Sequence, residues 1–174
     1  MVNQTTEGPW EDEKSTCDAF DIAIRDDRRF SNIYSEVTGI YTSRSPYEEN
    51  KTPRIDRVLI PSRALRNAEW VHGPIGIEIK APGSKLGRPI AQCLDYLRAS
   101  FEIMPGFHVP LSMVFLFQAP RFCGDLESIA IQHRIGTASL HRRGHIRFWR
   151  GATEIISLEE PSRNYMTLRK VGSR

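Results

Sequence analysis

Four segments of the chain carry the hydrophobic patterns of β-strands. Runs rich in β-branched and aromatic residues predict strands over Tyr34 to Thr42 and Arg54 to Ile60, with a polar loop from Ser43 to Pro53 between them. Alternating apolar and polar positions predict a third strand over Ile75 to Lys80. The almost continuously apolar run Leu111 to Gln118 is typical of a strand buried in the middle of a sheet.

Other segments have the spacing of helices. Asp18 to Arg29 fits either a strand or a short helix, and we favour the helix. A second helix is expected to begin at Pro89, a first-turn residue, and to end at Pro105 and Gly106. Its core stripe would be Ile90, Leu94, Leu97 and Phe101. Helical spacing also runs through Asp125 to Leu140, and a hairpin is expected from His145 to Trp149 and Glu154 to Leu158.

This order of elements predicts an α/β fold in which helices pack on a central mixed sheet. A length of 174 residues suits one domain. We expect that domain to span residues 17–160, after a polar, acidic N-terminal extension over residues 1–16. A basic C-terminal tail follows over residues 161–174.

Composition excludes several classes of protein. The longest mostly apolar stretch, His108 to Ala119, is too short to cross a bilayer, and residues 1–9 lack the order of a signal peptide. The three cysteines form no CxxC pair, which indicates reduced thiols and a cytoplasmic location. The chain also lacks GxxxxGK[ST], GxGxxG, HExxH and GxSxG motifs, which argues against nucleotide hydrolysis and zinc-protease chemistry.

Charge is distributed unevenly along the chain. Residues 1–29 hold eight acids and four bases, whereas residues 54–100 hold eight bases and four acids. Residues 121–150 hold six bases and two acids. Basic segments of this kind fit a polyanionic partner, because each lysine or arginine that binds a phosphate releases a counterion. Scattered surface charge that only keeps the protein soluble is an equally good interpretation of this feature alone.

Three residues on the predicted sheet carry the strongest chemical signal. Glu78 and Lys80 share one strand face, and Asp56 lies on the preceding strand, 22 residues before Glu78. Oxygen ligands from two neighbouring strands suit Mg²⁺ or Mn²⁺. A metal activates a water molecule and polarises a phosphoryl group, and a lysine stabilises the developing charge. Together these groups indicate metal-dependent hydrolysis of a phosphodiester.

The helix after this strand adds two polar residues. Gln92 and Tyr96 lie one turn apart, and the helical wheel predicts that they point away from the apolar stripe. The turn before the helix is basic because of Lys85 and Arg88. This polar face and basic turn would be available to bind a substrate phosphate.

In these stretches the chain resembles the PD-(D/E)xK nuclease superfamily, and within it the RecB-like branch, whose helix carries a QxxxY motif. The resemblance covers residues ~50–120. It implies a three-layer α/β/α restriction-endonuclease-like core and a Mg²⁺- or Mn²⁺-dependent deoxyribonuclease. The proline that usually precedes the aspartate is replaced by Ile55.

The resemblance also implies roles for individual residues. Asp56, Glu78 and the Ile79 carbonyl would bind the metal, and Lys80 would act with Asp56 and Glu78 in catalysis, as the base-like residue. Gln92 and Tyr96 would contact substrate phosphate and support the site, with Lys85 and Arg88 beside them. The family often adds an acid from its first helix, for which the sequence offers three candidates: Glu13, Asp18 and Asp21.

The expected function is therefore DNA cleavage with little sequence specificity, in DNA processing, recombination or repair. The sequence is compatible with a monomer and with a homodimer. Two other interpretations stay open: a non-catalytic nucleic-acid-binding module on the same fold, and a basic structural protein of a viral or replication assembly. In the last of these, the Glu-x-Lys strand would be an incidental solvated surface.

Overall fold

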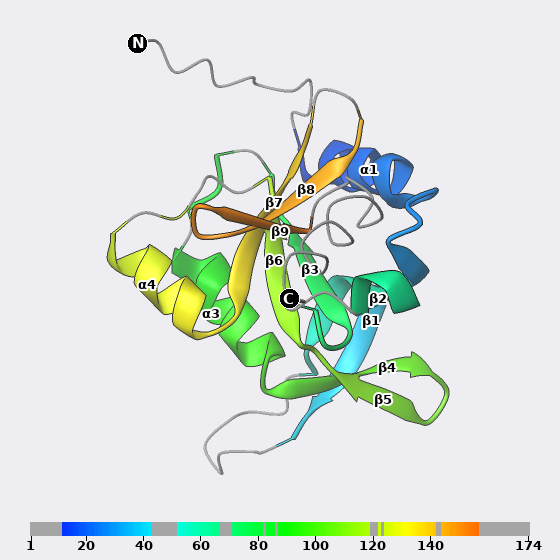
Figure 1. Cartoon of the computed structure of the whole chain (residues 1–174). Coiled ribbons are helices and arrows are strands. Elements are labelled where there is room, and N and C mark those ends of the chain that lie inside the picture. The colour runs from blue at the N-terminus through cyan, green and yellow to red at the C-terminus, as the bar shows by residue number, and fades with distance from the viewer. Residues whose placement is uncertain are drawn as a thin grey trace, which may run out of the picture.

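The computed structural model describes residues 12–42, 52–66, 71–81, 83–85, 87–118, 122, 124–141 and 144–156. Within these ranges the chain forms one nine-stranded mixed sheet with helices packed against it (Figure 1). The α/β class expected from the sequence is confirmed. The expectations for residues 1–11, for most of the loop before Pro53 and for the tail lie outside the described residues.

Four helices and nine strands make up the described part of the chain. In chain order they are α1 (Glu13–Ile24), β1 (Phe30–Tyr41), β2 (Arg54–Pro61), α2 (Arg63–Arg66), β3 (Ile75–Ile79), α3 (Gly87–Tyr96), β4 (Ala99–Met104), β5 (Phe107–Pro110), β6 (Met113–Phe117), α4 (Asp125–Gln132), β7 (Ile135–Leu140), β8 (Ile146–Arg150) and β9 (Thr153–Ile156).

The strand order is β5-β4-β1-β2-β3-β6-β7-β8-β9. Strands β3, β6 and β7 run parallel to one another, and all other neighbours are antiparallel. Parallel neighbours require crossover connections. Helix α4 makes the crossover from β6 to β7, whereas α3 and the β4–β5 hairpin together connect β3 to β6. The candidate metal ligands on β2 and β3 therefore lie on neighbouring central strands.

Buried side chains form two hydrophobic clusters. One contains Phe20 and Ile24 of α1 together with the isoleucines of β3. The other contains Ile90 of α3, Ala130 of α4 and residues of β2 and β6. Figure 1 shows α3 and α4 together on one side of the sheet and α1 on the other. Strand β6 is buried along its whole length, as its apolar sequence predicts.

Helix α1 begins at Glu13, inside the segment expected to be an N-terminal extension. A capping box fixes this start: the Asp12 carboxylate accepts a hydrogen bond from the Ser15 amide at 2.7 Å, and the Ser15 hydroxyl accepts one from the Asp12 amide. Thr16 is fully buried. The polar composition of this segment gave no sign of a helix, although Thr16 in its first turn lies in the core.

The second helix is shorter than expected. It ends at Tyr96, and Phe101, expected in the helical core stripe, lies in β4 opposite Gly39 of β1. The two strands approach so closely that a Cβ on Gly39 would lie 2.7 Å from the Ser100 carbonyl oxygen. Pro105 and Gly106 therefore form the turn of the β4–β5 hairpin instead of ending a helix.

Asp125 to Leu140 also splits into two elements, because α4 ends at Gln132 and β7 begins at Ile135. Arg134, between them, has φ +60, and a Cβ on Gly136 would lie 2.4 Å from the Trp149 carbonyl oxygen. Only tertiary pairing reveals this strand. The β8–β9 hairpin is confirmed, with antiparallel pairs on either side of the expected turn.

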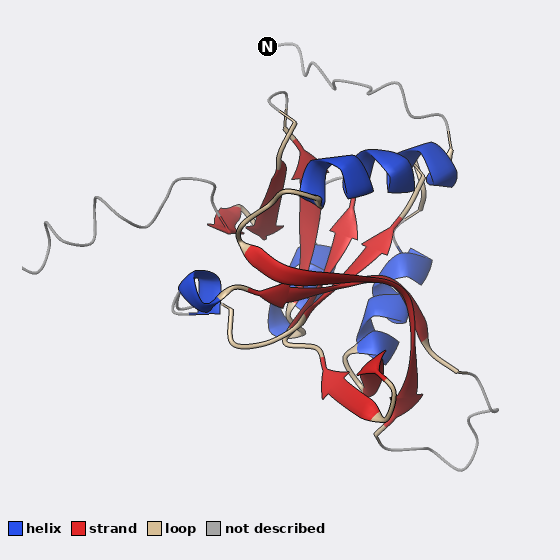
Figure 2. Cartoon of the chain, turned by 90° about the vertical axis from the view of Figure 1, so that its right-hand side faces the viewer, coloured by secondary structure: helices blue, strands red, loops and turns tan. Residues whose placement is uncertain are grey.

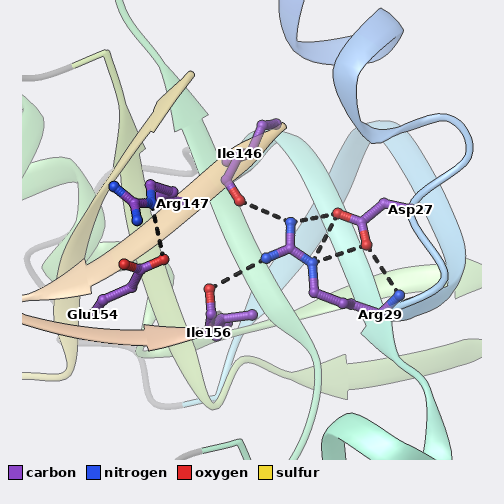
Figure 3. Close-up of polar contacts among 6 residues, drawn as sticks. All are labelled: Asp27, Arg29, Ile146, Arg147, Glu154 and Ile156. Atoms are coloured by element: carbon purple, nitrogen blue, oxygen red, sulfur yellow. Dashed lines mark hydrogen bonds and ion pairs between the residues drawn. The ribbon is translucent and has the colours of Figure 1, made fainter. Parts of the chain in front are cut away.

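A half-buried arginine, Arg29, connects the end of the sheet to the start of β1 (Figure 3). The Arg29 guanidinium donates to both Asp27 carboxylate oxygens and to the carbonyls of Ile146 and Ile156, at 2.8 and 3.2 Å. It also lies 5.4 Å from the Phe148 ring centroid. This arginine anchors the β8–β9 hairpin. In the described part of the chain, no helix is both long and apolar enough to span a membrane.

Candidate active site

The side chain of Asp56 is hydrogen-bonded to the end of β3. The ladder between β2 and β3 has its last pair at Arg57 and Ile77. Beyond that pair, the Asp56 Oδ2 atom accepts a hydrogen bond from the Ile79 amide at 2.6 Å. Because a carboxylate has two oxygens that can each accept several bonds, Oδ1 and part of Oδ2 stay available to a cation. The aspartate is thus fixed beside the Glu78–Lys80 segment.

Glu78 is buried, with 2% of its surface exposed. Its Oε1 atom lies 2.6 Å from the Lys80 Nζ, and its Oε2 atom is buried with no hydrogen-bond partner among the described residues. Burial, and then the nearby charge of Asp56, raise the pKa of Glu78. A buried carboxylate oxygen without a partner, next to a second carboxylate, is an arrangement that a cation would stabilise.

Lys80 is charged despite its half-buried position. Burial opposes the ammonium form, but the hydrogen bond to Glu78 and the charges of Glu78, Glu13 and Asp56 outweigh it, so the pKa of Lys80 is raised. Glu78, Glu13 and Asp56 come from three different elements, which are β3, α1 and β2 respectively. The raised pKa favours the ammonium form of Lys80.

The acids of α1 have different surroundings. Asp21 forms a bidentate pair with Arg57, and Asp18 is exposed. Of the three candidates for a first-helix acid, Glu13 is the one whose charge is among the main causes of the raised pKa of Lys80, while Asp21 serves an ion pair.

Gln92 and Tyr96 interact with each other, but they do not form an exposed face. Their side chains are joined by a hydrogen bond of 2.8 Å from Gln92 Nε2 to the Tyr96 hydroxyl, which itself donates to the Arg54 carbonyl at 2.7 Å. Tyr96 is 3% exposed and packs edge-on against Phe101, with ring centroids 5.8 Å apart. The expectation that Tyr96 points away from the core is wrong, because α3 ends at Tyr96 and β4 covers it.

Tyr96 borders the candidate site from the α3 side. Burial, and then the Glu78 carboxylate, raise the pKa of the Tyr96 phenol, so its hydroxyl keeps its proton. That single proton is donated to Arg54. Tyr96 therefore supports the ends of β2 and β3, and Gln92, which is half-buried, is the member of the pair nearer to solvent.

Lys85 and Arg88 are both exposed, on the approach to α3 and in its first turn. Neither side chain is among the groups that set the charge of Glu78 or Lys80. They lie where a basic turn was expected, and their exposure leaves them accessible to an anionic ligand.

Sequence reasoning missed two residues around Asp56. Arg57 has a side chain that is 7% exposed and that pairs with Asp21. Glu36, in β1, lies opposite Asp56, between the register pairs of Val37 with Ile55 and of Ser35 with Arg57. It has φ 54 and pairs with Arg54. The position of Arg57 depends on its burial and that of Glu36 on the strand register. No local sequence pattern predicts either property.

The described residues contain no group of three or more His, Cys, Asp or Glu side chains arranged to hold a metal ion. A cation here would have Asp56 and Glu78 as side-chain ligands, supplemented by the Ile79 carbonyl and by water. Mg²⁺ accepts such a set, because it usually keeps several water ligands and binds only one or two carboxylates.

The chain matches no known family model, no curated protein and no solved structure.

Proposed function

We propose that this protein is a metal-dependent nuclease that hydrolyses DNA phosphodiester bonds, with a RecB-like site on a three-layer restriction-endonuclease-like core. One observation carries the proposal. Asp56 is hydrogen-bonded to the strand end that bears Glu78 and Lys80, and the buried Glu78 carboxylate retains an oxygen without a partner. Helices on the two hydrophobic clusters of the sheet, α1 on one and α3 on the other, support the proposed layers.

The donor set fits Mg²⁺ or Mn²⁺. Asp56 and Glu78 would provide carboxylate oxygens and Ile79 its backbone carbonyl, all hard ligands. When bound, the metal would lower the pKa of a coordinated water molecule and polarise the phosphoryl group. The orphaned Glu78 oxygen would gain a partner, and the repulsion that raises the pKa of Glu78 would be relieved.

The side chains around the metal position would stabilise charge, support the site and bind DNA. Lys80 has three N–H donors, of which Glu78 accepts one, so its ammonium can also donate to a phosphate oxygen and stabilise the charge that develops there. Tyr96 holds the start of β2 through the Arg54 carbonyl, which fixes Asp56 two residues later. The exposed Lys85 and Arg88 would contact the DNA backbone.

Contacts of this kind are to phosphates and carry no sequence information. The proposed activity therefore has little sequence specificity, which suits DNA processing in recombination or repair. In the experiment, labelled single-stranded, duplex and branched DNA are each incubated with the protein, in Mn²⁺ and in EDTA. Cleavage in Mn²⁺ that EDTA abolishes supports the proposal. DNA binding without cleavage of any of the three substrates would contradict it.

A further inference from the structure

Arg57 is a buried cation that the proposed chemistry does not use. Its side chain is 7% exposed, and its guanidinium binds groups from two elements. Nε and Nη2 donate to the two oxygens of Asp21 on α1, at 2.8 and 2.7 Å. Nη1 donates to the main-chain carbonyl of Asp56 itself, at 2.7 Å. A third element, β1, contributes the Glu36 carboxylate, 4.0 Å from Nη1.

These contacts restrain the candidate metal ligand directly. The planar guanidinium fixes the direction of its donors, so a bidentate partner on one side determines where the remaining N–H points. Here Asp21 sets that direction, and Nη1 meets the backbone of Asp56. On the other side, the Asp56 carboxylate is held by the Ile79 amide. Backbone and side chain of one residue are thus each fixed by a hydrogen bond.

The same contacts hold α1 near the site. Asp21 lies two helical turns after Glu13, the α1 acid that acts on Lys80. A bidentate pair at Asp21 therefore limits how far α1 can slide or rotate on the sheet. Strand β1 contributes as well, because Glu36, whose backbone is left-handed with φ 54, places a carboxylate near the guanidinium.

We propose that Arg57 is a positioning residue of the candidate active site: by binding the Asp56 carbonyl and the Asp21 carboxylate together, it orients Asp56 as a metal ligand and fixes α1 beside it. Groups in this position around a metal commonly change its affinity by about ten- to a hundred-fold when they are replaced. The metal-binding part of this inference rests on the proposed function, whereas the restraint on Asp56 does not.

Arg29 offers a matched control. Its side chain is 12% exposed and also has a bidentate carboxylate partner and main-chain carbonyl acceptors, but its contacts are with Asp27 and the β8–β9 hairpin (Figure 3). Arg57→Lys and Arg29→Lys both keep the charge and lose the bidentate geometry. Both variants are expected to melt at a lower temperature than the wild type, so stability alone does not separate positioning from core packing.

Two measurements do separate them. Mn²⁺ affinity, followed by electron paramagnetic resonance, should fall about ten-fold or more in Arg57→Lys and less than about two-fold in Arg29→Lys. In the metal-free protein, hydrogen exchange of the Ile79 amide relative to the Ile75 amide should speed up by about ten-fold in Arg57→Lys and stay unchanged in Arg29→Lys. Asp21→Asn, at a half-buried position, should change both quantities in the same direction and by less.

The outcomes are distinct for the two claims. Equal Mn²⁺ affinity and unchanged Ile79 exchange in Arg57→Lys and Asp21→Asn would overturn the positioning role. Should Arg57→Lys fail to fold, Asp21→Asn decides on the same two measurements. A wild-type protein that binds no Mn²⁺ would refute the proposed function, and the exchange of the Ile79 amide would then still decide whether Arg57 fixes Asp56.

Discussion

The Tyr96 hydroxyl donates a hydrogen bond to the backbone carbonyl of Arg54, 2.7 Å away, and so joins the last turn of α3 to the first residue of β2. In the ribbon of Figure 2, helices (blue) lie on both sides of the strands (red) that they cover. Asp56 follows Arg54 by two residues. The link is buried on the α3 side, where Tyr96 packs with Phe101. The tyrosine of the QxxxY segment therefore acts on the site through the backbone of β2.

This contact predicts that Tyr96→Phe lowers stability as well as activity. The change leaves the Arg54 carbonyl and the Gln92 amide without their partner, which should cost about 1 to 3 kcal/mol in the free energy of unfolding. Urea unfolding measures it. Tyr34→Phe, on a half-buried tyrosine of the same cluster, is the control. An unchanged free energy of unfolding in Tyr96→Phe would show that the hydrogen bond is not important for the fold.

Lys80→Ala should abolish most cleavage. The variant removes the ammonium nearest to Glu78, so cleavage should fall by about two orders of magnitude or more. The buried Glu78 carboxylate would also lose its partner, and the variant should be less stable near neutral pH. Single-turnover rates measure the first effect and thermal melting the second. Lys14→Ala is the control, because Lys14 is exposed on α1 and has no part in the site; equal rates for the two variants would refute the role of Lys80.

Stability should respond to a metal in a pH-dependent way. The pKa of Glu78 lies above its ordinary value of 4.5 because of burial and Asp56, so the folded protein binds this proton more tightly than the unfolded chain does. Below pH 4.5 Glu78 is protonated in the folded and the unfolded protein, so it does not reduce stability. As the pH rises through the raised pKa, ionisation of the Glu78 carboxyl lowers the free energy of unfolding. A bound cation would offset this cost.

The rise in melting temperature on adding Mn²⁺ should therefore be larger at about pH 7.5 than at about pH 5. Differential scanning calorimetry at the two pH values measures it. Glu78→Gln should lose most of the Mn²⁺ effect at both. If Mn²⁺ raised the melting temperature equally at both pH values, or equally in the wild type and in Glu78→Gln, Glu78 would not be a ligand of the metal.

DNA binding should weaken steeply with salt. If the basic segments supply about four phosphate contacts, the slope of log K against log salt should lie near −3 to −4. Fluorescence anisotropy with a labelled oligonucleotide measures this slope, in Ca²⁺ or without metal to limit cleavage. Replacing both Lys85 and Arg88 by alanine should make the slope shallower by about 2. A slope near zero would mean that these segments do not contact DNA.

The sequence predicted the central strands correctly because their signals are local. Alternation in Ile75 to Lys80 placed the isoleucines on one face and Glu78 on the other. In the structure the isoleucines lie in the cluster that contains α1, and Glu78 interacts with Tyr96 of α3. Strand β6 was equally clear from its apolar run. Such patterns report which side of a strand is buried, and two adjacent buried strands are enough to bring Asp56 to the end of β3.

Features that depend on tertiary pairing were not predictable in the same way. The continued periodicity through Leu97 and Phe101 suggested one helix, because nothing local shows that Phe101 pairs with Gly39. Tyr96 was expected outside for the same reason. Arginine is usually found at the surface, so nothing local indicates that Arg57 is buried. Its burial depends on the pairing with Asp21, 36 residues earlier in the chain. The metal-ligand candidates were thus easier to identify than the residues that hold them.

Mn²⁺-dependent cleavage by the wild type and by Asp56→Asn tests the central claim most directly. The substitution keeps the size of the side chain and an oxygen that can accept from the Ile79 amide, but it removes the negative charge proposed to bind the metal. On whichever labelled DNA the wild type cuts, the account predicts cleavage that requires Mn²⁺, and a rate in folded Asp56→Asn lower by at least about two orders of magnitude. No cleavage by the wild type, or equal rates in the two proteins, would contradict it.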